Sequence, residues 1–158
     1  MENVLEEVLE AWRTNNRINL FLIDRISNEG MRCTLSPRGG RNVVRQFAHM
    51  HNVRVSHLKN RSGDLAEGLY QFDTYEGPDK ETLKGHLQAS SERLETFFER
   101  CITGSGKARP LKKGVIPYLG YFISHESHHR GNILLTLKQC GHKVDQASAY
   151  AIWDWEKM

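Results

Sequence analysis

The sequence has few cysteines, few prolines and no long hydrophobic run. Its three cysteines are an odd number, lie far apart and form no C-x-x-C pair, which argues against a disulfide framework and against a zinc ribbon. No apolar stretch approaches the roughly 18 residues that a membrane span needs. With 39% hydrophobic and 26% charged residues, the composition is that of an ordinary soluble globular protein.

The net charge is also small, because 22 Lys and Arg residues oppose 19 Asp and Glu residues. Nucleic-acid binding would need a concentrated basic face with stacking aromatic side chains, so we expect no nucleic-acid partner. The first ten residues carry four acids and lack the basic and apolar regions of a secretory signal. We therefore expect a cytoplasmic protein that neither crosses nor binds a membrane.

The hydrophobic period predicts four long helices. A chain of 158 residues is expected to form a single domain, 1–158, with a core that needs no structural metal. Apolar residues recur at helical spacing over residues 3–26, with an irregularity expected near 13–17, and again over 41–60, 79–102 and 117–140. Asp79 is the expected N-cap of the third helix, and Gly141 the stop of the fourth.

The remaining segment, residues 145–158, is expected to form a short last helix whose Trp153 and Trp155 dock on the body of the protein. No segment shows sustained alternation of apolar and polar residues, so no strands are predicted. The predicted fold is all-α, a four-helix bundle with a short C-terminal fifth helix, and such bundles often build metal sites from side chains on facing helices.

The fourth predicted helix contains "FISHESHHRGN", with three histidines in five positions. Residues four apart on a helix lie on one face, so His125 and His129 can face one ion, whereas His128 lies about 100° from His129 and points elsewhere. A catalytic site commonly takes three protein ligands, so a third must come from another segment. The second predicted helix offers His49, His51 and His57. Helical phase places His51 on the apolar stripe, and His49 off it.

The same stretch matches H-E-x-x-H, in which two histidines bind zinc and the glutamate acts as general base. A zinc protease would use His125, Glu126 and His129 in these roles. Such proteases pair this helix with a sheet whose edge strand binds the peptide. Because no strand is predicted here, this alternative is the weaker one, and Glu126 is a weak candidate for a catalytic base.

The order of a long helix, "FAHMHNVRVSHL", a packing helix and "HESHHRGNILLTLKQCGH" resembles the DinB/YfiT-like superfamily of metal-dependent enzymes over essentially the whole chain. The block H-x-x-H-H-R-G is the most specific part. The resemblance implies a divalent metal ion, zinc or nickel, held by His49, His125 and His129, with Glu126 in solvent or behind the ligands. The sequence departs from the family at Asn132, where glutamine is usual.

The resemblance further implies a homodimer and an enzyme, a transferase or hydrolase, in which the ion activates a water or thiol nucleophile. Its partner would be a small-molecule substrate, for example a low-molecular-weight thiol. The alternative from another class is a non-catalytic, metal-binding or stress-response dimeric bundle. The residues themselves leave open which of these functions applies.

Overall fold

Four long helices form the body of the protein. The structure, a computed structural model, describes residues 2–158, and within that range it contains helices and no strand. The short helices α2 and α4 were not predicted. In chain order the elements are α1 (Glu2–Arg25), α2 (Asn28–Met31), α3 (Val43–Arg61), α4 (Gly63–Ala66), α5 (Lys80–Thr103), α6 (Val115–Gln139) and α7 (Gln146–Ala151).

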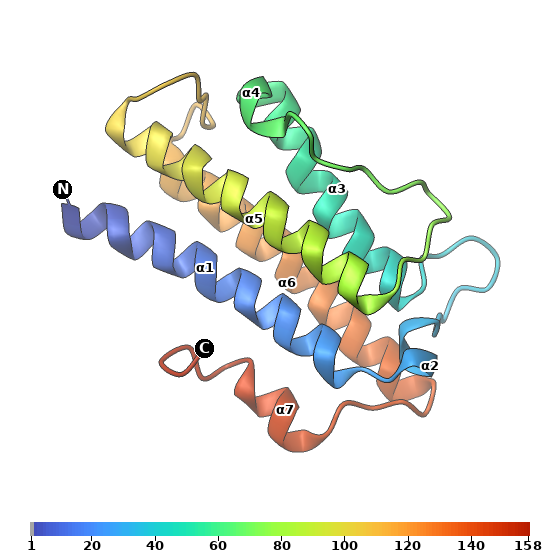
Figure 1. Ribbon diagram of the computed structural model, residues 1–158. Helices are drawn as coiled ribbons and strands as arrows, with labels where there is room; N and C mark the ends of the chain where they lie inside the picture. The colour runs from blue at the N-terminus through green and yellow to red at the C-terminus, as the bar shows by residue number, and fades with distance from the viewer. Residues whose placement is uncertain (1) are drawn as a thin grey trace.

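The long helices pack side by side as a bundle. Helices α1 and α3 each contact both α5 and α6. Helices α3 and α5 run in one direction, and α1 and α6 run in the opposite one (Figure 1). The prediction of an all-α fold with four long helices and a short C-terminal helix is confirmed.

The helix ends follow local chemistry. The carboxylate of Asp79 accepts a hydrogen bond from the backbone N–H of Thr82 at 2.8 Å, as expected for an N-cap. Helix α6 ends at Gln139, and Gly141 adopts a positive φ of 80°, which a residue without Cβ adopts at little cost.

Helix α1 is continuous, so the irregularity predicted near residues 13–17 is wrong. Asparagine has low helix propensity because its side chain competes for backbone hydrogen bonds. Here the asparagine side chains are occupied elsewhere: Asn15 donates to Glu126 and Asn16 donates to Gln88. Tertiary contacts therefore override the local preference.

The hydrophobic core consists of two clusters separated by buried polar residues. On α6, for example, Phe122 belongs to one cluster and Ile133 to the other, with Glu126 between them. On α1, Trp12 and Ile18 flank Asn15 in the same way. We call the buried polar side chains at this level the polar layer; its members are Asn15, Asn16, Asn19, His51, Arg54, Ser90, Glu126 and Arg130.

An ion pair lies at the centre of the polar layer. Arg54 and Glu126 are both fully buried, and the guanidinium donates to the carboxylate at 2.6 and 2.9 Å. Asn15 and Asn19 each donate to the same carboxylate at 2.7 Å. Buried charges are tolerated when they are paired and fully hydrogen-bonded, and this arrangement meets both conditions.

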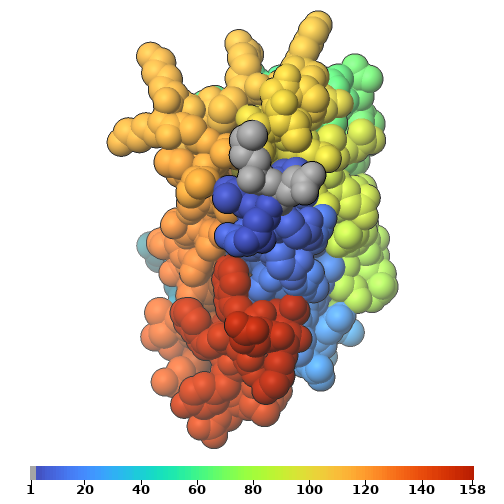
Figure 2. Space-filling model, turned by 90° about the vertical axis from the view of Figure 1, so that its left-hand side faces the viewer, coloured from blue at the N-terminus to red at the C-terminus, as the bar shows by residue number. Residues whose placement is uncertain are grey.

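The C-terminal segment lies across α1 and α6 (Figure 2). Its buried residues are Ser148 and Ile152, and Ile152 joins the core together with Val144, which directly precedes the segment. Trp153 is 75% exposed, so the prediction that it docks the segment is wrong, whereas Trp155 is 41% exposed and lines a cavity together with Ile18 and Leu134 of the bundle. Helix α7 ends at Ala151, and the turn that follows directs Ile152 inward and Trp153 outward. Within residues 2–158, every helix is too short or too polar to cross a membrane.

Candidate metal centre

Three histidines from two helices converge at the edge of the bundle. His49 comes from α3, and His125 and His129 come from successive turns of α6. The ring centroids lie 5.4 Å (His49–His125), 4.9 Å (His49–His129) and 4.8 Å (His125–His129) apart. Among residues 2–158 this is the one group of three or more potential metal ligands, and one nitrogen of each ring lies within 4.8 Å of the others.

This spacing fits a metal ion after small side-chain rotations. Nitrogen ligands at about 2.0–2.1 Å from a tetrahedral zinc ion lie about 3.4 Å from one another. Because α3 and α6 are antiparallel neighbours, His49 lies opposite the His125 and His129 turns. All three side chains are half-buried, so the cluster has access to solvent. We call these residues the histidine cluster.

His51 does not join the histidine cluster. It is fully buried, as helical phase predicted, and faces α5. Its Nε2 lies 2.8 Å from the carbonyl oxygen of Tyr70, and its Nδ1 lies 3.0 Å from the hydroxyl of Ser90. Because both ring nitrogens have partners, His51 is a member of the polar layer.

His128 points away from the histidine cluster, as helix geometry predicted. It is exposed, and its Nε2 lies 3.2 Å from the side-chain amide of Asn132, one turn further along α6. Asn132, the position that departs from the family pattern, therefore contacts a histidine that is outside the cluster. It also lines a cavity beside His129.

The electrostatic surroundings keep the cluster neutral. Burial, together with the positive charge of Arg41 and the neighbouring rings, lowers the pKa of His49 to about 4 and that of His129 to about 4. Burial also lowers the pKa of His125. Neutral imidazole is the form that binds metal ions, so at neutral pH the three rings are ready to act as ligands.

Gln46 orients one of the rings. Its side-chain oxygen lies 3.3 Å from Nδ1 of His129. An amide oxygen only accepts hydrogen bonds, so Nδ1 of His129 carries the proton and Nε2 keeps its lone pair. Partners of this kind fix the tautomer of metal-binding histidines. Sequence reasoning did not identify Gln46; its position three residues before His49, on the same helix face, was the available signal.

His125 provides the test of fit. Its Nδ1 is buried and has no hydrogen-bond partner within residues 2–158. A buried polar atom without a partner costs about 1–3 kcal/mol, and a ligand that reaches this nitrogen would offset that cost. Three imidazoles without a carboxylate suit zinc, nickel, copper or iron. The donor set and the unpaired nitrogen both fit a divalent ion.

Glu126 is not part of the histidine cluster. Of the two expected places, in solvent or behind the ligands, its full burial excludes solvent. Its carboxylate points into the polar layer, because adjacent residues on a helix diverge by about 100°. Burial alone would raise the pKa of Glu126, but the Arg54 guanidinium outweighs it and holds this pKa below its ordinary value. A carboxylate occupied by Arg54, Asn15 and Asn19 is a poor general base, and no strand within residues 2–158 could bind a peptide. The geometry therefore gives the zinc-protease interpretation no support.

Arg130 has a structural role as well. It is buried in the polar layer, and its Nη1 donates to the side-chain oxygen of Asn19 at 2.8 Å. Asn19 in turn donates to Glu126. The structure therefore gives Arg130 a contact within the bundle.

Comparison with known proteins gives one family. The model of the DinB family matches residues 1–157, a range that contains both helices of the histidine cluster. No curated protein and no solved structure matches the chain. Because the family match covers essentially the whole sequence, the chain belongs to the DinB family.

Proposed function

We propose that the protein is a cytoplasmic, metal-dependent enzyme in which His49, His125 and His129 hold a zinc or nickel ion with an open coordination position. The observation that carries this proposal is the convergence of three neutral imidazoles, one with a buried, unpaired nitrogen. When bound, such an ion acts as a Lewis acid that brings the pKa of a water or thiol ligand toward neutrality. A thiol transferase and a hydrolase are the two reaction types that this chemistry supports.

The surroundings of the histidine cluster favour a small anionic reactant. Neutral ligands leave the charge of the ion uncompensated, and the exposed Arg41 adds to it. A cavity of about 350 Å³ borders the cluster and is lined by Arg41, Gln46 and His129 among others. This volume suits a small molecule such as a low-molecular-weight thiol. A homodimer is the assembly that we propose from the family resemblance.

Elemental analysis tests the ligand set. Protein purified without a histidine tag should contain stoichiometric metal, His49→Ala should lose it, and His51→Ala should keep it. His128→Ala is the matched control, because His128 is exposed, neighbours the cluster and points away from it. If His51→Ala lost the metal while His49→Ala kept it, the ligand set would be wrong. Retention of metal in both would refute a three-histidine site.

Turnover tests the enzymatic part of the proposal. Metal-loaded protein should consume a low-molecular-weight thiol in the presence of an electrophilic acceptor, or hydrolyse a small ester or amide, and His125→Ala should abolish the reaction. Full metal content without turnover on either substrate class would favour the non-catalytic bundle instead. Light scattering at micromolar concentration checks the homodimer.

A further inference from the structure

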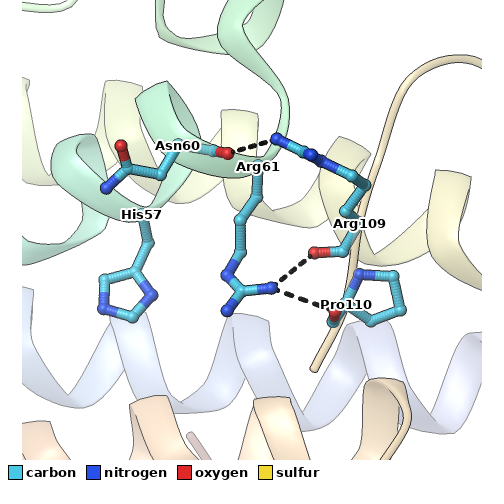
Figure 3. Close-up of a pocket in the computed structure, with 5 residues that line it drawn as sticks. All are labelled: His57, Asn60, Arg61, Arg109 and Pro110. Carbon is cyan, nitrogen blue, oxygen red and sulfur yellow. Dashed lines mark hydrogen bonds between the residues drawn. The ribbon is translucent and has the colours of Figure 1, made fainter. Parts of the chain in front are cut away.

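A second group of polar side chains lies where the end of α3 meets the loop before α6. It surrounds a cavity of about 460 Å³ (Figure 3). We call it the basic pocket; its lining residues are His57, Asn60, Arg61, Arg109 and Pro110. None of them belongs to the histidine cluster.

The basic pocket has cations without counterions. Arg61 and Arg109 line the same cavity, and neither forms an ion pair with a carboxylate within residues 2–158. The lining contains no acid, and the loop adds the exposed Lys107, Lys112 and Lys113. Charges of one sign around a cleft concentrate anions there. The pocket is therefore electrostatically complementary to an anion.

The two arginines are held in place by backbone contacts. Nη1 of Arg61 donates to the carbonyl oxygens of Arg109 and Pro110, at 3.0 Å each, and its guanidinium lies 5.0 Å from the ring centre of Tyr118. Nη2 of Arg109 donates to the carbonyl oxygen of Asn60 at 2.8 Å. Figure 3 shows these hydrogen bonds. Each guanidinium keeps further N–H donors for a ligand, and planar donors held in advance suit carboxylate and phosphate groups.

Aromatic rings connect the basic pocket to the histidine cluster. The ring of His57, which lines the pocket, lies 5.2 Å from that of Tyr121. The Tyr121 ring in turn stacks on His125, with 6.1 Å between centroids and 11° between planes. Tyr121 is 41% exposed. A molecule lying over this tyrosine would have one end at the cluster and the other in the basic pocket.

We propose that the basic pocket binds the carboxylate or phosphate group of an anionic small molecule, and that this molecule is the substrate of the metal centre. The link between this molecule and the metal centre rests on the proposed function, whereas anion binding by the basic pocket does not. Anion binding is therefore tested on metal-free protein, so that the ion itself cannot bind the probe.

Calorimetric titration at low salt, with inorganic phosphate and separately with succinate, measures the affinity. Arg61→Gln and Arg109→Gln should each weaken binding by at least about tenfold, because each removes a charged donor. Arg93→Gln, which removes an exposed arginine of α5 that forms no ion pair in the described chain, is the matched control and should bind as wild type does. The probe that binds more tightly shows whether the ligand carries a phosphate or a carboxylate group. Arg109 is exposed, so its variant should fold even if Arg61→Gln does not.

Three results would contradict the proposal. If neither probe binds, the pocket is not an anion site. The same conclusion follows if Arg93→Gln weakens anion binding as much as Arg61→Gln and Arg109→Gln do. With the metal-loaded enzyme, Arg109→Gln should raise KM at least about tenfold with little change in kcat, because the pocket is remote from the reacting atoms. An unchanged KM beside weakened anion binding would overturn the link to the metal centre while leaving the proposed function intact.

Discussion

Glu126→Gln should remove a large part of the stability of the protein. Glu126 is the one acid of the polar layer, where it faces the buried Arg54 and Arg130. The variant leaves two buried guanidiniums without an anion and replaces one acceptor oxygen by an NH₂ group. Removing one partner of a buried ion pair costs about 3–5 kcal/mol in the free energy of unfolding.

Urea denaturation followed by circular dichroism measures this loss. For a chain of this length it corresponds to a melting temperature lower by about 6–20 °C. The control is Glu81→Gln, which removes an exposed partner of Lys84 and should change the free energy of unfolding by less than about 1 kcal/mol. A Glu126→Gln variant within about 1 kcal/mol of wild type would refute the structural role of this carboxylate. If Glu126 acted as a general base, the Glu126→Gln variant would instead lose activity and keep its stability.

The pH dependence supplies a second check. The folded pKa of Glu126 lies below its ordinary value of 4.5, so the ion pair stabilises the fold fully above that pH. As the pH falls below 4.5, the unfolded chain takes up the proton first and this stabilisation declines. The difference in unfolding free energy between wild type and Glu126→Gln should therefore narrow in acid. A difference that stayed constant from pH 7 to pH 3 would contradict the assignment.

Four further outcomes are expected. Gln46→Leu should weaken metal binding by about 10–100-fold in competition with a chelating dye, because His129 loses the partner that sets its tautomer; an unchanged affinity would exclude this role. Gly104→Ala should lower the free energy of unfolding by about 1–2 kcal/mol, because Gly104 has a φ of 71° and no steric contact obscures the effect. In the same denaturation experiment Gly85→Ala, in the second turn of α5 with open space around it, should stabilise the protein by about 0.5–1 kcal/mol. Leu87→Ala, at a fully buried position, should cost about 2–5 kcal/mol; a smaller loss would mean that the core closes around the cavity.

Local chemistry accounts for what could be predicted of the fold. The helices predicted from apolar residues at helical spacing are observed. So are the two predicted helix ends, at the N-cap Asp79 and at Gly141 with its positive φ, because each depends only on residues nearby in the chain. The positions of His125 and His129 on one face of α6 follow from the same helical period. Where neighbours in space dominate, as at the asparagines of α1 and at Trp153, local prediction failed.

The sequence by itself determined the helical fold, the pair of histidines on α6 and the divergence of His128, because each depends on the geometry of a single helix. Helical phase alone pointed to His51 and the family resemblance to His49, and only the tertiary structure shows why His49 is the one that meets the pair: the packing of α3 against α6 brings it there, while His51 faces Tyr70 and Ser90. The same holds for Glu126, which follows a cluster residue in sequence but is directed toward Arg54. The partners of these side chains lie on other helices, and the sequence pattern of a single helix does not predict contacts between helices.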